Sequence, residues 1–372
     1  MKISEIDTTD RRQVRRFLQL PFRLYRQTSQ WVPPLEGDAR LMLDRRRHPF
    51  YRHSQAAFLL AERDGQIVGR LAVLDNRNYN AFNNERTAFF YLFECEDDRE
   101  ISQGLFEGAF AWARARGLDK ILGPKGLTAT DGMGLLVSGF EHRPALGIPY
   151  NLPYYAGLVE AAGFEASGEV VSGYLSREIN FPERIHQLAE IVRRRRGLRV
   201  ARYQNRRDLR ALVPQLGKMY NAVLEGTSGN VPLTQDGIET IARQMLTFAD
   251  PHLIKIVFKD DEPVGFLFAY PDISAALQRT RGRLFPLGWI DVLLDFRRTR
   301  WVNINGAGMI EKYRGLGGTA LLFSEMYKSV REGHFDHADI VQIGVENQNM
   351  QREMRDLGID FYKTHRMYQR AQ

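Results

Sequence analysis

Glycines crowd one short stretch of the chain, "EKYRGLGGTALLF" (311–323), directly before an apolar run with helical spacing. The start of a helix leaves backbone N–H groups unpaired and carries the positive end of the helix dipole, so it attracts anions. Glycine has no Cβ, which lets the backbone approach a phosphate closely. Gly315, Gly317 and Gly318, which follow Arg314, therefore predict either a turn that cradles a diphosphate or a tight connection without a ligand.

The histidines and the single cysteine are not spaced as metal ligands or as a reactive thiol site. His334 and His337 lie three apart in "HFDHADI", but no cysteine or acidic set completes a zinc site around them. Cys95 is the single cysteine and stands among acidic residues in "FECEDD", whose negative charge raises the pKa of a thiol. We predict a structural role for Cys95 and no metal site.

Regular elements surround the glycine turn. The segment "TRWVNINGAGMI" (299–310) is predicted to be a strand, residues 319–332 a helix that ends at Gly333, and "ADIVQIGV" (338–345) a second strand. The turn therefore leads from a strand into a helix, which is the arrangement that an anion site of this kind requires.

Two pairs of segments repeat at nearly equal distances. Residues 59–76 and 255–272 each have a strand, a charged turn, Val-Gly and a second strand, which is typical of a β-hairpin. Their Val-Gly pairs begin at 68 and 264, which is 196 residues apart. Gly163 and Gly358 each end a helix and are 195 residues apart. The offsets indicate a duplicated domain, unless two short matches agree by chance.

A length of 372 residues is itself too great for one ordinary core. We predict an N-terminal domain over 1–180, a linking helix over 181–197 and a C-terminal domain over 198–372. The arginine run at the end of that helix fits a solvated last turn near the negative end of the helix dipole better than a nucleic-acid site.

Composition and charge bound the function. Hydrophobic residues make up 44% and charged residues 26%, which is ordinary for a globular protein. The net charge of +7 favours anionic partners, including phosphorylated cofactors, acidic lipids and nucleic acids, without choosing among them. No apolar stretch has the roughly 20 residues that cross a bilayer, and the charged N-terminus lacks a signal core. We expect a cytoplasmic protein.

The order strand, Arg-Gly-x-Gly turn, helix, strand resembles the GNAT (GCN5-related) N-acyltransferase superfamily, which binds acyl-coenzyme A. The family turn follows Arg/Gln-x-x-Gly-x-Gly/Ala; Arg314 and Gly317 match it, and Thr319 replaces its last residue. The resemblance implies an α/β fold of two tandem GNAT-like domains, each a mixed, mostly antiparallel sheet flanked by helices. It also implies transfer of an acyl group, expected to be acetyl, from coenzyme A to an amine of a small molecule or peptide.

The resemblance assigns roles to particular residues. Its coenzyme A site maps onto the turn, the end of the preceding strand and the asparagine after the next strand: Met309, Ile310, Arg314, Gly315, Leu316, Gly317, Gly318, Thr319 and Asn347. Glu346 lies beside that asparagine, where the family's two central strands part over the thioester. We expect Glu346 either to take the proton from the acceptor amine or only to help to cap the next helix.

One family residue is missing. The tyrosine that often protonates the departing thiolate would fall at Met354. Tyr362 and Tyr368 lie downstream and either supply a hydroxyl or pack as ordinary strand aromatics. The thiolate can also leave without help, because a thiol has a pKa near 8.5.

The N-terminal half resembles the same superfamily in outline, but acidic residues and no glycine follow its strand "RTAFFYLFECEDD". Carboxylates repel a diphosphate, so we expect a degenerate copy that does not bind coenzyme A. The glycine- and proline-rich segment 123–155 is too long for a plain connection. It is predicted either to close over an acceptor or to pack between domains, with Tyr150, Tyr154 and Tyr155 in a pocket or in the core.

Two other functions remain compatible with the sequence. One is aminoacyl transfer from aminoacyl-tRNA on the same tandem fold, which the net charge permits and the Arg-Gly-x-Gly turn argues against. The other is a non-catalytic protein that binds acyl-coenzyme A, which the missing tyrosine permits. We do not expect nucleic acid as a partner, and the sequence specifies no oligomeric state.

Overall fold

The computed structural model describes residues 1–128, 130–179, 182–224 and 231–371. Contacts divide the chain into two compact units, and each combines segments that are distant in sequence. The first unit comprises Met1–Val171, Ser274–Val292 and Lys363–Gln372. The second comprises Ser172–Ile273 and Leu293–Tyr362.

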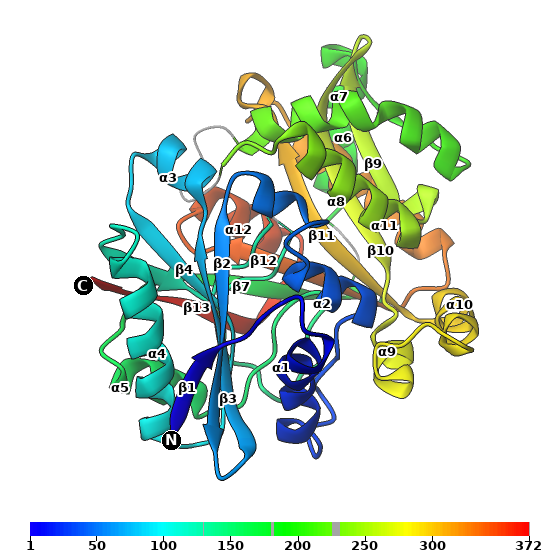
Figure 1. Cartoon of the computed structure of the whole chain (residues 1–372). Helices are drawn as coiled ribbons and strands as arrows, with labels where there is room; N and C mark the ends of the chain where they lie inside the picture. The colour runs from blue at the N-terminus through cyan, green and yellow to red at the C-terminus, as the bar shows by residue number, and fades with distance from the viewer. Residues whose placement is uncertain (129, 180–181, 225–230, 372) are drawn as a thin grey trace. The chain divides into compact units, whose positions relative to one another are not determined.

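A mixed sheet forms the middle of the first unit, and most of its strands are labelled in Figure 1. In spatial order they are β1 (Lys2–Glu5), β2 (Gln55–Arg63), β3 (Gln66–Asp75), β4 (Thr87–Cys95), β5 (Lys120–Gly123) and the C-terminal part of β13 (Asp360–Ala371), to which β6 (Leu135–Ser138) is also paired. β4 and β5 are parallel, and the other neighbouring pairs are antiparallel.

Helices cover both faces of this sheet because its strands bury alternate side chains on each side. The helices of this unit are α1 (Arg11–Leu24), α2 (Glu36–Leu43), the 3-10 turn η1 (Pro49–Arg52), α3 (Arg77–Asn83), α4 (Arg99–Arg114), α5 (Tyr155–Ala161) and α9 (Ser274–Thr280). On β2, Leu59 packs in the cluster that contains Phe106 of α4. Its neighbour Phe58 packs edge-on against Phe17 of α1, with ring centroids 5.4 Å apart. A fully buried side chain of this size stabilises the fold by roughly 1.5–3 kcal/mol.

The second unit repeats this plan. Its strands, in spatial order, are β12 (His337–Gly344), β11 (Trp301–Met309), β10 (Glu262–Pro271), β9 (Ile254–Lys259) and β8 (Leu198–Ala201). β11 and β12 are parallel, and the other pairs are antiparallel. Its helices are α6 (Glu183–Arg196), α7 (Arg206–Leu224), α8 (Gln235–Phe248), η2 (Pro251–Leu253), η3 (Glu311–Tyr313), α11 (Gly318–Glu332) and α12 (Gln348–Asp356). β7 (Glu165–Ser176), β13 and α10 (Gly288–Arg298) contribute residues to both units.

Both predicted hairpins are present, as β2–β3 and β9–β10. In the first, Arg63 pairs with Gln66 around Asp64 and Gly65, which have φ of +52° and +78°. Positive φ at both central residues belongs to the tight turn that matches the twist of a hairpin. The duplicated order of elements predicted from the sequence is therefore confirmed.

A helix also lies near the predicted linker, at Glu183–Arg196. Residues 180 and 181, where the predicted boundary falls, lie outside the described residues. The division at 1–180, 181–197 and 198–372 stays a prediction about the duplication, because the compact units are not continuous in sequence.

Candidate active site

A bulge interrupts β11 before its end. Ala307 pairs with Leu267 and Ile304 with Ala269, so Asn305 and Gly306 together lie opposite one residue of β10. Gly306 has a φ of +131°, which is readily available only to glycine. A bulge bends its strand and re-aims the side chains around it, and for this reason bulges are frequent beside active sites.

The two parallel strands of the second unit part beyond the bulge. β11 and β12 pair from Trp301 opposite His337 as far as Ile304 opposite Ile340. Both strands continue, β11 to Met309 and β12 to Gly344, without further pairing to each other in the described register. Backbone polar groups on this side of β11 can therefore accept an extended ligand in place of a neighbouring strand.

Backbone alternation decides which groups face this gap. The Ile310 N–H donates to the Val264 carbonyl at 3.0 Å, and the Ile310 carbonyl accepts from the Tyr313 N–H at 2.9 Å. Adjacent residues in a strand direct their amides to opposite sides. The Met309 N–H therefore points away from β10, toward the gap, whereas the Ile310 amide is occupied. Of these two predicted pantetheine contacts, the geometry favours Met309.

The glycine turn lies at the end of β11 and begins α11. Gly315 and Gly317 have φ of +68° and +82°, and Gly317 caps the helix. The first hydrogen bond inside the helix runs from the Leu321 N–H to the Gly317 carbonyl at 3.1 Å. Consequently the N–H groups of Gly318, Thr319 and Ala320 have no acceptor within the helix, and no side chain among the described residues caps them. Unpaired amides at the positive end of the helix dipole attract anions, so the turn is compatible with the diphosphate site, which stays a prediction.

Close packing supplies a second reason for two of these glycines. A Cβ at Gly317 would lie 2.5 Å from Cγ2 of Val192 on α6, and one at Gly318 would lie 2.5 Å from Cε of Met309. A Cβ at Gly315 would meet nothing within 4 Å. Gly317 and Gly318 therefore allow α6 and β11 to approach, whereas packing does not require a glycine at position 315.

Arg314 connects the turn to the rest of the unit. Its Nε donates to the Met309 carbonyl at 3.1 Å, and an Nη donates to the Val223 carbonyl in the last turn of α7 at 2.8 Å. These bonds orient the turn and occupy part of the guanidinium. The arginine predicted as a charge at the phosphate rim is thus also a structural tie.

Comparison with known proteins gives two distant relatives in sequence. No protein-family model matches the chain. It is 26% identical over 367 residues to Protein YghO of Escherichia coli, covering 95% of this chain and 92% of that protein. It is 27% identical over 372 residues to the bacterial ceramide synthase of Caulobacter vibrioides, covering 96% of this chain and 95% of that protein.

Solved structures give a closer match in architecture. A tandem GNAT protein from the clavulanic acid biosynthesis pathway superposes with a TM-score of 0.59, covering 100% of this chain and 98% of that one at 13% identity. The chain has the tandem GNAT fold. A GCN5-related N-acetyltransferase from Anabaena variabilis matches with a TM-score of 0.53 at 10% identity, covering 99% of this chain and 72% of that one. The fold class expected from the family resemblance, two tandem GNAT-like domains, is confirmed.

The remaining predicted residues follow β12. Asn347 caps α12 by accepting from the Met350 N–H at 3.1 Å. Glu346 is exposed, and its carboxylate has no hydrogen-bond or ion-pair partner in the described part of the chain. Met354 is 1% exposed and belongs to the core of the second unit, so the usual tyrosine position holds a packing residue.

The two downstream tyrosines, Tyr362 and Tyr368, belong to different units. Tyr368 belongs to the first unit, where it is buried and donates to Glu160 at 3.1 Å. Tyr362 belongs to the second unit and donates to Oδ2 of Asp339 at 2.8 Å. Burial and the neighbouring Asp339 carboxylate raise the pKa of Tyr362, which makes this phenol a poor proton donor to a thiolate.

Sequence inspection missed a buried polar group near the gap. Asp339 is 2% exposed and pairs across the sheet with Asn303, one residue before β11 and β12 part. Asn303 donates to the buried Asp272 at 3.3 Å, and Asn305 in the bulge donates to the Tyr270 hydroxyl at 2.9 Å. The signal was present, because "VNIN" and "ADIV" each place a polar residue inside an apolar strand.

The first unit contains the same strands but not the glycine turn. Gly69 on β3 pairs with Cys95, as Gly265 on β10 pairs with Met309. Only residues 96–98 separate β4 from α4, whereas residues 310–317 separate β11 from α11. The Asp98 carboxylate also caps α4 by accepting from the Glu100 N–H at 2.8 Å. A carboxylate thus occupies the helix start where the second unit has open amides, and the absence of coenzyme A binding by the N-terminal copy stays a prediction.

A buried ionic group fills the first unit beside this strand end. Glu94, which matches Gly308 in register, accepts from the hydroxyls of Tyr25 at 2.7 Å and Tyr155 at 2.8 Å. Arg70 lies 3.4 Å from the other carboxylate oxygen. Burial raises the pKa of Glu94, and Arg70 and the two hydroxyls oppose that shift. These contacts make the cluster a structural core and place Tyr155 there.

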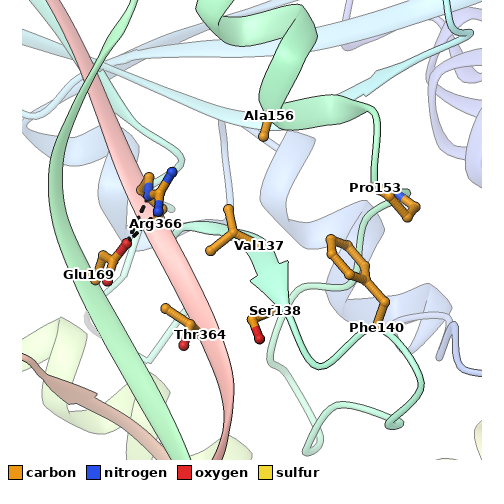
Figure 2. Close-up of a pocket in the computed structure, with 8 residues that line it drawn as sticks. All are labelled: Val137, Ser138, Phe140, Pro153, Ala156, Glu169, Thr364 and Arg366. Carbon is orange, nitrogen blue, oxygen red and sulfur yellow. Dashed lines mark hydrogen bonds and ion pairs between the residues drawn. The ribbon is translucent and has the colours of Figure 1, made fainter.

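The 123–155 segment lines a pocket of about 400 Å³ in the first unit. Figure 2 shows Phe140 and Pro153 on one side and the ion pair of Glu169 and Arg366, with Nε to Oε1 at 2.8 Å, on the other. Val137, Ser138, Ala156 and Thr364 complete the lining. None of the three predicted tyrosines is among these residues: Tyr154 donates to the Cys95 carbonyl at 2.7 Å and Tyr150 to the Phe140 carbonyl at 3.0 Å.

Proposed function

We propose that the second unit binds an acyl-coenzyme A and transfers its acyl group to an amine. The observation that carries this proposal is the separation of β11 from β12 after Ile304, followed along the chain by the uncapped start of α11 at Gly318. An extended pantetheine arm can pair with the free edge of β11, while its diphosphate accepts from the amides of the turn. Acyl-coenzyme A supplies the activated thioester.

We assign the steps of the proposed transfer to particular residues of this unit. The Met309 N–H is directed to the gap, where it can polarise a carbonyl oxygen that gains charge during amine attack. Arg314 and Gly315–Thr319 hold the anionic end of the donor, and Asn347 fixes the start of α12. We propose Glu346 as the base that removes the ammonium proton, with Asp339 as the buried competitor. Since Met354 has no proton to give, the thiolate leaves unassisted or takes a proton from water.

For the acceptor we propose a long-chain amino alcohol. The support is the relative named bacterial ceramide synthase, because a ceramide is the amide of a fatty acid with such an amine. On this proposal a long-chain acyl-coenzyme A is the donor, in place of the acetyl donor expected from the sequence. Both donors therefore belong in the test.

The test combines donor binding with thiol release. Calorimetry with acetyl- and palmitoyl-coenzyme A measures binding, and a thiol reagent measures turnover with small amines, a peptide amine and a sphingoid base as acceptors. Gly315→Asp adds a negative charge where a Cβ meets nothing within 4 Å, and aspartate tolerates the positive φ. We expect donor binding at least tenfold weaker, which is about 1.4 kcal/mol.

Gly315→Asn is the matched control, because asparagine has the same shape without the charge. We expect its donor affinity within threefold of the wild type. Equal binding by wild type and Gly315→Asp would refute the coenzyme A site. Binding without thiol release on any acceptor would leave the non-catalytic alternative, and steeply salt-dependent tRNA binding would favour aminoacyl transfer.

A further inference from the structure

Apolar side chains stand in solvent on the segment between α9 and β11. Phe285 is 81% exposed and Leu287 is 68% exposed in the loop before α10. On α10, four large side chains are more than a third exposed: Trp289, Ile290, Leu293 and Leu294. Isolated exposed leucines are ordinary in folded proteins, but a contiguous group of this size marks an interaction surface. We call these six residues the α10 patch.

A surface helix usually buries its apolar stripe against the protein, whereas α10 exposes its stripe to solvent. Residues 289, 290, 293 and 294 face outward, whereas Val292 is buried. On the half-buried side, Asp291 is held by two nitrogens of Arg279, with contacts of 2.8 and 3.1 Å. One side of the helix thus contacts the protein through Val292 and Asp291, and the apolar stripe remains exposed on the other side.

Arginines surround the α10 patch. Residues 279–300 contain six arginines and two aspartates, a net charge of +4. Arg297 and Arg298 end the helix, are exposed and have no hydrogen-bond or ion-pair partner among the described residues. Arg283, on the other side of the patch, is exposed and lies 3.5 Å from Glu36. The patch is therefore an apolar surface with a cationic rim.

We propose that the α10 patch docks this protein onto the surface of an anionic phospholipid bilayer. A helix that lies in the membrane interface has apolar and aromatic side chains on one side and arginine or lysine at its edge, as α10 has. Tryptophan favours the interfacial region, and arginine stems extend so that the guanidinium reaches the headgroups.

The length of α10 fixes the mode of contact. Eleven residues make a helix of about 16 Å, which is too short for a hydrocarbon core of about 30 Å. Among the described residues, no helix combines the length and the apolar character that crossing a bilayer requires. The segment therefore lies on the bilayer and does not cross it.

Charge argues against a second copy of the chain as the occupant. A symmetric dimer through this patch would bring the same surface of each copy together. Arg297 and Arg298 would then face a second set of cations near an apolar, poorly screened contact, where like charges repel. Anionic headgroups give these arginines the opposite charge.

The test uses the full-length protein and vesicles of phosphatidylcholine alone or with 30 mol% phosphatidylglycerol. We expect sedimentation with the anionic vesicles at least fivefold above that with the neutral ones, decreasing as salt rises. The double variant Leu287→Ser/Leu293→Ser should lose at least four fifths of this binding. Phe82→Ser is the control, because Phe82 is 58% exposed on α3 and lies outside the patch.

The charged rim is tested separately. Arg297→Gln/Arg298→Gln should lower binding to anionic vesicles at least threefold, whereas Arg194→Gln/Arg195→Gln removes the same charge from exposed positions on α6 and should not. A blue shift of tryptophan emission on adding vesicles should disappear in Trp289→Phe, because Trp289 is the exposed one of the four tryptophans.

The proposal is overturned if the Leu287→Ser/Leu293→Ser and Phe82→Ser variants sediment alike. It is equally overturned by a wild-type dimer in sedimentation velocity that this double variant makes monomeric, without vesicle binding by either. Neither measurement uses an acyl donor, so failure here and failure of the proposed transferase activity are distinguished.

Discussion

Two carboxylates are candidates for the base of the proposed reaction, and their environments differ. Glu346 is exposed after β12, whereas Asp339 is buried and held by Tyr362 where the two strands part. We expect Glu346→Gln to lower turnover at least tenfold, about 1.4 kcal/mol of barrier, with unchanged binding of the acyl donor. Asp339→Asn is the companion variant, measured in the same thiol-release assay. If Glu346→Gln stays within twofold while Asp339→Asn loses activity, the base is Asp339.

His365 gives the first unit a dependence on pH. It is fully buried, its Nε2 lies 3.0 Å from the Pro149 carbonyl, and its Nδ1 has no partner in the described chain. Burial lowers the pKa of His365 to about 4, from an ordinary value of 6.5. Below pH 6.5 this histidine is therefore protonated in the unfolded chain but remains neutral in the folded chain. The free energy of unfolding consequently decreases as the pH falls toward 4.

Between pH 7.5 and pH 5.0 this histidine should remove about 2 kcal/mol of stability. His365→Gln, whose amide can still donate to the Pro149 carbonyl, should lower stability overall but flatten its change with pH. Urea unfolding of both proteins at the two pH values measures the difference. An equally steep dependence in the variant would mean that other groups cause it.

At the scale of elements, the start of α11 depends on its contact with α6. Both Gly317→Ala and Gly315→Ala place a Cβ on a residue with positive φ, which is unfavourable. Only the Cβ at position 317 also lies against the Val192 side chain. We expect a loss of about 1 kcal/mol for Gly315→Ala from the backbone alone. Gly317→Ala should lose at least 1 kcal/mol more, because the side chain overpacks. Thermal unfolding compares them; equal losses would show that α6 moves away without cost.

How far the sequence predicts these elements depends on what each pattern reports. The strand expected over 299–310 and the helix over 319–332 appear as Trp301–Met309 and Gly318–Glu332, because periodic apolar residues and glycine breaks record local geometry. The burial of Asp339 was not predicted, because a single acidic residue does not interrupt the apolar pattern of a strand and so gives no separate signal. α10 was missed because pattern analysis assumes that apolar side chains face a core, and here they face outward.

At the scale of the whole molecule, no local pattern predicts that the C-terminus completes the first unit. Residues 368–371 of β13 pair with β5, and residues 364–366 pair with β6. A chain that ends after Tyr362 should therefore lose structure in the first unit. We expect the amides of β5 to exchange with solvent at least a hundredfold faster in hydrogen-exchange measurements.

A chain that ends after Arg370 is the control, because it keeps the pairs Tyr368–Gly123, Gln369–Leu122 and Arg370–Ile121. It should protect β5 nearly as well as the full chain. Undiminished protection in the protein that ends after Tyr362 would show that the first unit is stable without β13.

This placement of β13 has a consequence for synthesis on the ribosome. The N-terminal segment of the first unit ends at Val171, and the segment that completes its sheet begins at Lys363, 192 residues later by subtraction. At about 5–20 residues per second, translation takes on the order of 10–40 seconds to supply it. During that interval the nascent chain holds β5 with an unfilled edge, and such edges are sites of wrong pairing and aggregation. We therefore expect chaperones to bind the first unit during synthesis, until β13 has left the exit tunnel and paired with β5.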